Sequence, residues 1–385
     1  MFLDLNEEQR LIRETAREFA TAELAPVAAA LDRGEEQELF FANLKKLAEL
    51  GFMGLNVATD YGGTEAGVIA FSVALTEIAK ACAATAVTVS VNNMVCEVIQ
   101  AVGSKEQRER YIPKICSGEF LAGAFALTET GAGSDPAAMT TSAVQDGDDW
   151  ILNGSKIFIT SAPYAGVFVV WAVTDRTAPK GKGISCFLVE AGTPGCLIGR
   201  AEEKMGQHAS ATNELLLQNC RIPASSLMGG LNDGFRVAVA ELAGGRIGIG
   251  SLALGIGLAA MDAAARYASA RKQFGHTLSD FQSIQWKIAD ATTELEAARL
   301  LLMNAAFCKE QGKSYSREAS MAKLFATEAA NRVCYEALQI FGGYGYTAEF
   351  PVERFSRDVR ITTIYEGTSE IQRLIIARDV LRNYA

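Results

Sequence analysis

Histidine is scarce in this sequence, and its cysteines never occur in a metal-binding spacing. Only two histidines, His208 and His276, are present among 385 residues, and they lie far apart. No C-x-x-C pair occurs among the eight cysteines, which stand at positions 82, 96, 116, 186, 196, 220, 308 and 334. Zinc or iron–sulfur ligation is therefore not expected, and neither is a Ser–His–Asp or Cys–His mechanism. The scattered thiols favour a reducing compartment over a disulfide framework.

Long apolar runs and an excess of basic residues are also missing. No run of about 20 apolar residues is present, so no membrane span is expected. The net charge is -9 with acids and bases interspersed, which disfavours nucleic-acid binding because that function usually needs a basic face. The N-terminus is acidic and does not resemble a signal peptide. With 49% apolar residues, the chain is long enough for two or three domains around a large core.

The spacing of apolar residues divides the chain into three parts. Residues 1–120 carry helical patterns, residues 121–232 carry short strand patterns, and residues 233–385 return to long helices. The order is helices, sheet, helices, without βαβ alternation or an internal repeat. We therefore expect an α+β multidomain fold with an N-terminal α-helical domain, a middle β-sheet or barrel domain and a C-terminal four-helix bundle.

Local signals predict individual elements. Asn6 with Gln9 three residues later predicts a capping box at the first helix. The pair Asn153-Gly154 predicts a hairpin turn between strands at 150–152 and 156–160. Further strands are expected at 167–173, 184–189 and 215–217. Helices are expected over 38–50, 68–81, 87–102, 235–271, 281–312 and 316–341.

Two glycine patterns resemble a dinucleotide fingerprint without its context. G-x-G-x-x-A occurs from Gly248 and again from Gly255, and both copies lie inside a helical run with no preceding strand. A dinucleotide site needs a strand, a tight turn and then a helix, so these glycines are interpreted as helix-packing positions. No P-loop pattern is present.

Two other glycine-containing segments are candidate binding loops. Residues 126–136 follow a strand-like run and combine hydroxyls, two acids and two glycines. Thr128 and Ser134 can donate to ligand oxygens there, although a tight polar turn accounts equally well for the pattern. Residues 339–346 end a long helix with three glycines among aromatics. A left-handed glycine cap is expected at that end, but three glycines exceed what a cap needs.

The most informative segment is 360–373, which contains a single carboxylate between Tyr365 and Gly367. This residue, Glu366, directly precedes a predicted helix, because Thr368 and Ser369 are good N-caps. An apolar stripe behind them is expected at positions 371, 374, 375 and 380. A carboxylate at this place can act as a base, or it can be an ordinary first-turn acid that interacts with the helix dipole.

Taken in order, these three segments resemble the acyl-CoA dehydrogenase family, and the similarity extends across essentially the whole chain. A fourth block, Arg271-Lys272-Gln273-Phe274-Gly275 followed by Phe281-Gln282, matches as well. The resemblance implies non-covalent FAD between the β domain and the bundle, an acyl-CoA substrate, an electron-transferring flavoprotein as partner and a homotetramer. We expect a bacterial cytoplasmic protein or, if a transit peptide has been removed, a mitochondrial matrix protein.

The resemblance implies several groups of FAD contacts. Those of the loop along the flavin ring are Phe125, Leu127, Thr128, Gly133 and Ser134. Those of the strand that covers the flavin are Phe158, Ile159 and Thr160. The pyrophosphate and adenosine half of FAD would be contacted by Arg271, Gln273, Phe274, Phe281 and Gln282. A further part of that contact, usually made across a subunit interface, would come from Gln339, Ile340, Gly342 and Gly343. Those beside the base are Thr368, Ser369 and Glu370.

The same resemblance gives Glu366 the role of the base that removes the α-proton, while the β-hydrogen leaves as hydride to flavin N5. Burial is expected to raise the pKa of Glu366. Its backbone N–H, joined by an FAD ribityl hydroxyl, would stabilise the enolate oxygen. The family's second location for the base aligns with Gly245, which cannot take a proton, and nearby Glu241 is offset by about a turn.

Substrate contacts implied by the resemblance are Ser134, Arg246, Tyr365 and Gly367. Many members carry an aspartate that helps to hold the pantetheine arm where this chain has Ala243, so an altered mode of acyl-CoA binding is a hypothesis. The segment 90–93 resembles short-chain members, and we expect a short, branched or cyclic acyl group.

Three alternatives remain open. An acyl-CoA oxidase-like or enoyl-CoA reductase flavoenzyme would share the fold, and a non-catalytic helical scaffold would keep it without the chemistry. A nicotinamide enzyme has the least support, because neither glycine match follows a strand.

Overall fold

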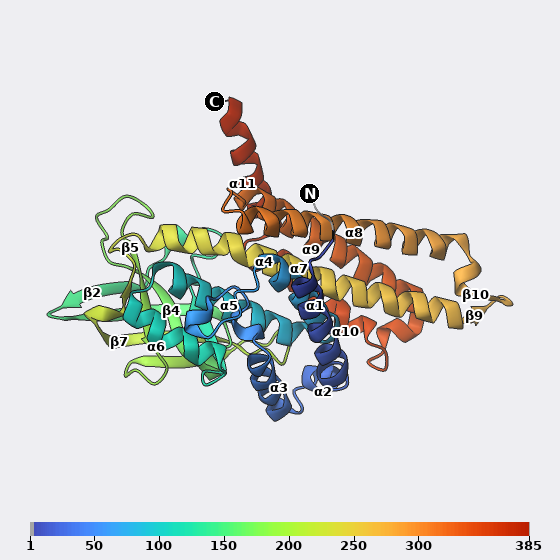
Figure 1. The fold of residues 1–385 in the computed structure, drawn as a ribbon, viewed down its shortest axis with the longest axis horizontal. Coiled ribbons are helices and arrows are strands. Elements are labelled where there is room, and N and C mark those ends of the chain that lie inside the picture. Colours follow the sequence, from blue (N-terminus) through green and yellow to red (C-terminus); the bar gives the residue numbers. More distant parts are fainter. Residues whose placement is uncertain (1–3, 385) are drawn as a thin grey trace.

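Helices form both ends of the chain and an eight-stranded sheet forms its middle, in a computed structural model that describes residues 4–384 (Figure 1). The predicted capping box is confirmed: Asn6 accepts from the Gln9 amide, and the Gln9 side chain accepts from the Asn6 amide. The N-terminal helices are α1 (Glu7–Phe19), α2 (Ala28–Asp32), α3 (Gln37–Glu49), α4 (Val68–Ala81), α5 (Ala83–Val102) and α6 (Lys105–Cys116). α4 and α5 are buried almost throughout, so their sequences are apolar on all sides.

The middle sheet has the strand order β6-β7-β3-β2-β4-β5-β8, with β1 added in parallel to β4. Its strands are β1 (Ala122–Ala126), β2 (Ser142–Asp146), β3 (Asp149–Thr160), β4 (Ala165–Val173), β5 (Ile184–Glu190), β6 (Cys196–Ala201), β7 (Thr212–Pro223) and β8 (Leu227–Met228). The two ends of this order, β6 and β8, do not pair within the described residues. The expected sheet or barrel is therefore an open sheet rather than a closed barrel.

The hairpin predicted around Asn153-Gly154 is wrong. β3 runs through both residues, and the chain reverses earlier, between β2 and β3, where Gly147 has a φ of 61°. Asn153 and Gly154 lie at a register shift against β7. Gly154 lies so close to Thr141 that an added Cβ would be 2.5 Å from the Thr141 Oγ1. The glycine is needed for this close approach at an irregular strand position, which the local Asn-Gly signal cannot distinguish from a turn.

Long helices build the C-terminal part: α7 (Gly234–Ala270), α8 (Gln282–Glu310) and α9 (Ser316–Phe341), followed by α10 (Val352–Arg360) and α11 (Ser369–Leu381). The predicted role of the α7 glycines in packing is confirmed. A Cβ added to Gly250 would lie 2.6 Å from Leu302 of α8, and one added to Gly255 would lie 2.3 Å from the Thr76 carbonyl of α4. α7 therefore packs closely against helices on two sides.

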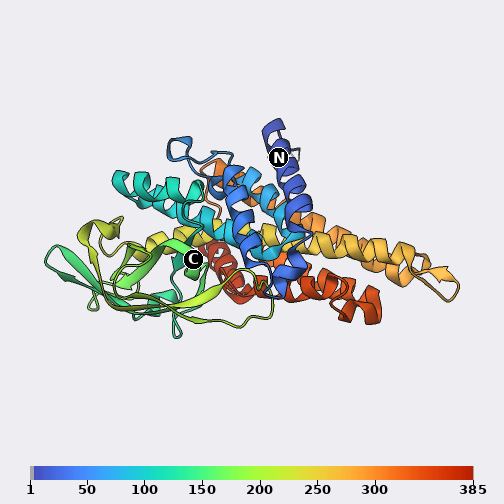
Figure 2. The ribbon, with the colours of Figure 1, turned by 90° about the horizontal axis from the view of Figure 1, so that it is seen from below.

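The long axis of the molecule separates two regions. α7 and α8 extend to the small hairpin of β9 (Lys272–Gln273) and β10 (His276–Thr277), which lies at the opposite end from the middle sheet (Figures 1 and 2). By length and composition α7 could cross a membrane, but 72% of its most apolar window is buried inside the protein, as in the core helix of a globular fold.

One prediction at the C-terminal end is confirmed and another differs from the structure. The residues of the predicted apolar stripe lie on helix α11, although Leu374 is 42% and Val380 41% exposed and α11 projects from the body (Figure 1). Gly342 has the positive φ expected of a helix cap, 60°, but its ψ of -134° lies outside the left-handed helical region. Glycine tolerates that conformation because it has no Cβ.

Candidate active site

Glu366 lies on a strained turn between α10 and α11. Its φ is 57° and that of Gly367 is 90°, values that a residue with a side chain rarely adopts. Two buried side chains from different helices hold the turn. Lys323 Nζ of α9 donates to the Gly367 carbonyl at 2.7 Å, and Gln372 Nε2 of α11 donates to the same oxygen at 2.8 Å. The predicted N-cap is confirmed, since Thr368 Oγ1 accepts from the Ile371 amide.

The carboxylate of Glu366 points into the protein and is free to react. Its Oε2 is buried and has no hydrogen-bond partner among the described residues. Burial raises the pKa of Glu366 to about 7, against the opposing effects of Arg246 and Lys323. A base with a pKa near neutral pH is suited to general-base catalysis, because it is partly ionised and still binds a proton.

Tyr365 connects this turn to the middle domain. Its hydroxyl accepts from Gln207 Nε2 at 3.3 Å, and the same nitrogen donates to the Asp358 carbonyl at 2.9 Å. The Gln207 amide donates to Asp358 Oδ1 at 2.5 Å. The segment between β6 and β7 therefore fixes both α10 and the residue that precedes Glu366.

A cluster of buried charges borders the site. Glu97 of α5 pairs with Lys309 of α8 and accepts from Asn56 at 2.7 Å. Glu241 of α7 lies beside this pair, and burial together with Glu97 raises its pKa well above the usual range. Glu241 and Gly245 both lie in α7, and their sequence spacing separates them by about one helical turn.

The first group of predicted FAD residues lies in the middle sheet. Leu127, Thr128 and their loop follow β1, and Phe158 to Thr160 end β3. A buried ion pair joins the two segments: Lys156 Nζ is 2.8 Å from Glu129 and 3.1 Å from the Leu127 carbonyl, and the Ile157 amide donates to Thr128 at 2.9 Å.

Features of this group fit a planar apolar ligand. Phe158 is 60% exposed at a φ of 58°, and Phe125 packs on Trp171 with its ring centroid at 4.3 Å. No atom lies within 4 Å of a Cβ added to Gly131, and only Thr128 reaches that distance from Gly133. Ile159 is buried, whereas Ser134 lies exposed on the loop.

The second group lies at the end of the molecule opposite the sheet, around the β9–β10 hairpin (Figures 1 and 2). The Arg271 guanidinium lies 5.6 Å from the Tyr344 ring centroid, and Tyr267 stacks on Phe341 at 4.1 Å, so the α7 end and the α9 end are adjacent. Phe274 is 90% exposed, and Cβ atoms on Gly342 or Gly343 would meet nothing within 4 Å. Ile340 is buried, while Gln273, Gln282 and Gln339 are exposed and Phe281 is half-buried.

One chain therefore does not bring all predicted FAD residues together. The sheet group belongs to the segments that follow β1 and end β3, whereas the hairpin group lies at the opposite end of the long axis. The residues beside the base, Thr368, Ser369 and Glu370, form the first turn of α11, and the Ser369 Oγ is buried without a partner among the described residues. Buried polar atoms without a hydrogen-bond partner, glycines with free space beside them and exposed aromatic rings are features that fit contact with FAD.

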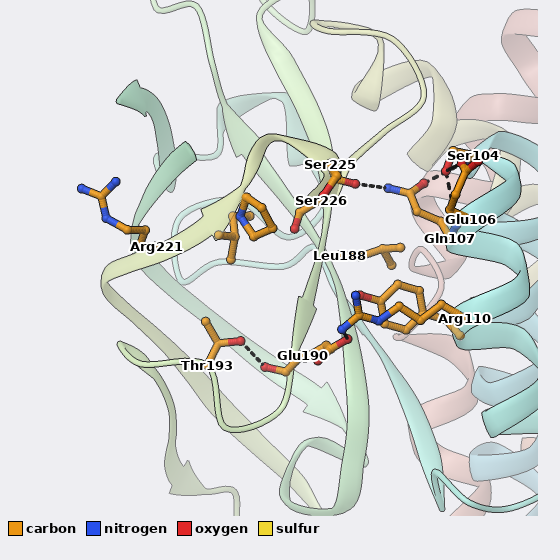
Figure 3. A pocket seen from close by; sticks show the side chains of 13 residues that line it. Ser104, Glu106, Gln107, Arg110, Leu188, Glu190, Thr193, Arg221, Ser225 and Ser226 are labelled. Atoms are coloured by element: carbon orange, nitrogen blue, oxygen red, sulfur yellow. Dashed lines mark hydrogen bonds and ion pairs between the residues drawn. The ribbon is translucent and has the colours of Figure 1, made fainter. Parts of the chain in front are cut away.

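One cavity of the protein lies away from these residues. A cavity of about 430 Å³ lies between α6 and the sheet, but it contains none of the predicted site residues (Figure 3). Its charged side chains already have partners: Arg110 pairs with Glu190 at 2.6 Å, and Arg221 pairs with Asp149 at 3.0 Å. Gln107 donates to the Ser225 carbonyl at 2.7 Å across the gap. This cavity is an interdomain gap and is not the candidate site.

No group of three or more potential metal ligands occurs among residues 4–384. All eight cysteines are free thiols.

Comparison with known proteins identifies the family. Models of the N-terminal, middle and C-terminal domains of acyl-CoA dehydrogenase match residues 6–119, 124–220 and 232–381. The chain belongs to the acyl-CoA dehydrogenase family. It is thus an oxidoreductase and a flavoprotein whose cofactor is FAD.

Individual relatives cover nearly the full chain. The mouse mitochondrial short-chain specific acyl-CoA dehydrogenase is 46% identical over 384 residues, which are 99% of this chain and 92% of that protein. The acryloyl-CoA reductase (NADH) of Anaerotignum propionicum is 44% identical over 386 residues, 99% of this chain and 96% of that protein. The structure of butyryl-CoA dehydrogenase from Megasphaera elsdenii has a TM-score of 0.95 at 39% identity and covers 99% of this chain and 100% of that one.

Proposed function

We propose that this enzyme dehydrogenates a short, branched or cyclic acyl-CoA thioester, with Glu366 as the base that removes the α-proton. The observation that carries the assignment is the Glu366 carboxylate, which has a buried, unpartnered oxygen on a turn held by side chains from two helices. An ordinary first-turn acid would be exposed and would need no such support. Electrons are then passed to an electron-transferring flavoprotein.

This reaction needs a base for the α-proton and a donor that stabilises the enolate oxygen, and residues of this chain can supply both. Glu366 accepts the proton next to the thioester carbonyl. Negative charge then develops on the carbonyl oxygen, and the Glu366 backbone N–H is available to stabilise it, because it donates to no acceptor within residues 4–384. FAD, when bound, supplies the acceptor for the β-hydride. Arg246, Ser134, Tyr365 and Gly367 are proposed to contact the acyl-CoA.

The surroundings of Glu366 favour a short acyl group. A Cβ added to Gly245 would lie 3.0 Å from the Met94 sulfur, and one added to Gly248 would lie 2.5 Å from Ser90 Oγ, so α5 packs directly on α7 beside the base. Val87 and Val89 are buried in α5 as core residues. Packing of this density leaves little room for a long chain next to the carboxylate.

We also propose that a second copy of the chain completes each FAD site, within a homotetramer. The exposed residues Arg271, Gln273 and Phe274 of one subunit would then contact the pyrophosphate and adenosine half of FAD held by the sheet of another. The uncovered apolar stripe of α11 supports an assembly, since a large exposed apolar surface usually marks an interface.

A panel of acyl-CoA thioesters, mixed anaerobically with the FAD-loaded enzyme, tests this function. Bleaching of the flavin absorbance by butyryl-CoA, isobutyryl-CoA or a cyclic analogue, and little bleaching by palmitoyl-CoA, would support it. Bleaching by none of them would contradict it. In air, rapid peroxide formation would identify an oxidase instead.

The reductase alternative is supported by the similarity to the Anaerotignum enzyme, which runs in the opposite chemical direction. Comparing oxidation of the reduced enzyme by an enoyl-CoA with reduction of the oxidised enzyme by the saturated thioester distinguishes the two directions.

A further inference from the structure

A fully buried lysine lies under the turn that carries Glu366. Lys323, in the N-terminal third of α9, is 0% exposed, and its ammonium donates to the Gly367 carbonyl at 2.7 Å. No carboxylate lies within ion-pair distance of it in the described part of the chain. Burying a charged group without an ion pair is expensive, so an unpaired ammonium at this position indicates a role beyond packing.

Arg246 of α7 is a second buried cation near the same carboxylate. It is 5% exposed, its Nη1 makes only long contacts to the hydroxyls of Ser316 (3.5 Å) and Ser320 (3.4 Å), and its Nε has no partner among the described residues. Both cations influence the ionisation of Glu366, yet neither forms an ion pair with it. The Glu366 Oε2 therefore keeps a free lone pair.

We propose that Lys323 is a positioning residue for the base: anchored on the Gly367 carbonyl, it holds the turn and places a positive charge near the Glu366 carboxylate without pairing with it. A direct ion pair would occupy the oxygen that must take the proton and would make the carboxylate a poor base. A cation one peptide unit away avoids this, because Coulomb stabilisation acts at longer range than a hydrogen bond. The inference rests on the proposed function of Glu366.

Other charged groups also lie near Glu366 and Lys323 and affect the ionisation of both side chains. Around Glu366 they are Arg246 and Glu241 of α7, Lys323 of α9 and the adjacent Tyr365. Around Lys323 they are Glu366, Arg246, Glu328 and Glu370. Burial lowers the pKa of Lys323 to about 8, and the negative charge of Glu366 opposes that effect. At neutral pH Lys323 is therefore mostly charged.

The pH profile of flavin reduction tests the proposal. Wild type and Lys323→Met are mixed anaerobically with butyryl-CoA, and the apparent pKa of the reduction rate is measured. Loss of the cation should raise that pKa by about one unit, so that the rate falls about tenfold at pH values below it and approaches wild type above it. Lys323→Arg, which keeps a charged donor, should restore most of the profile. Lys287→Met, which removes a partly exposed lysine of α8, is the control.

A second readout needs neither substrate nor flavin. The stabilisation gained by Glu366→Gln at pH 8 is measured in the wild-type background and in the Lys323→Met background, which together form a double-mutant cycle. A larger increase in the free energy of unfolding in the Lys323→Met background would support the coupling between Lys323 and Glu366. If Lys323→Met does not fold, Lys323→Gln, which keeps a donor but no charge, takes its place.

Superimposable pH profiles, or a rate loss that is equal at every pH, would overturn the proposal, as would a cycle without coupling energy. Failure of the wild type to bleach with any acyl-CoA would instead contradict the proposed function and leave the stability cycle to decide the role of Lys323.

Discussion

A Cβ atom on Gly245 would lie 2.7 Å from Oε2 of Glu366, so α7 and the base can approach each other only because position 245 has no side chain. The Met94 sulfur, 3.0 Å from the same point, closes the other side. The two neighbours leave no room for even a methyl group.

Gly245→Ala should therefore displace the Glu366 carboxylate. We expect the rate of flavin reduction to fall at least about tenfold, because small misplacement of a reacting group is costly. FAD content and the melting temperature should change much less. Gly230→Ala, whose Cβ would meet nothing closer than 3.6 Å, is the matched control. A fully active Gly245→Ala enzyme would show that the carboxylate does not work from this position.

The raised pKa of Glu366 predicts that the base destabilises the fold at neutral pH. Burial moves its pKa from the usual 4.5 to about 7, so the folded state binds this proton more tightly than the unfolded chain does. The free energy of unfolding then falls as the pH rises through this window. Glu366→Gln should be more stable than wild type by up to about 3 kcal/mol above pH 7, and the gain should vanish near pH 4.5.

Chemical denaturation at several pH values measures this difference. The control is Glu370→Gln, because the Glu370 side chain is 80% exposed on the next helix turn and should give no comparable gain. A stability difference for Glu366→Gln that is independent of pH would contradict the buried, pKa-shifted carboxylate.

The Lys156–Glu129 pair should hold in place the two segments that we propose to contact the flavin. Lys156 is 0% and Glu129 6% exposed, and although burial raises the pKa of Glu129, Lys156 and its hydrogen bonds hold it at about 2. Lys156→Met leaves a buried carboxylate unpaired and should destabilise the protein by about 3–5 kcal/mol. Weaker FAD retention should accompany this, measured as flavin per protein after gel filtration. Lys114→Met, which breaks a more exposed pair, should be near wild type.

The predicted FAD residues are divided between the middle sheet and the β9–β10 hairpin at the opposite end of the molecule, and this division predicts complementation between subunits. Arg271→Ala should lose FAD and Glu366→Gln should lose catalysis. In a mixed assembly, one kind of site combines an intact Glu366 from one subunit with an intact Arg271 from the other. Co-expression of the two inactive variants should therefore restore activity, and assays of the purified hetero-oligomer measure it. Absence of any recovery in confirmed hetero-oligomers would indicate that each FAD site is built from a single chain.

Local patterns in the sequence were sufficient to place Glu366 on the turn before α11, but not to find the side chains that support this turn. Thr368 and Ser369 mark a helix start, and this start puts Glu366 on the preceding turn. Lys323 and Gln207 act on that turn across 44 and 158 residues of sequence. Such contacts follow from packing of whole domains, and apolar periodicity does not encode them. A lysine on the otherwise small-residue, apolar face of α9 was the one available signal for Lys323.

The turn misassigned at Asn153-Gly154 has the same origin. The dipeptide has the chemistry of a hairpin turn, but the close contact that requires glycine is made with Thr141, which directly precedes β2. Likewise, the α11 stripe was recognised by its period, but its period does not show that the rest of the chain leaves it exposed.

Anaerobic mixing of Glu366→Gln with butyryl-CoA tests the central claim most directly. We expect the variant to keep its FAD and to bind the thioester, seen as a perturbed flavin spectrum, while the rate of bleaching falls by at least about 10²-fold. Bleaching at the wild-type rate would show that another group removes the proton.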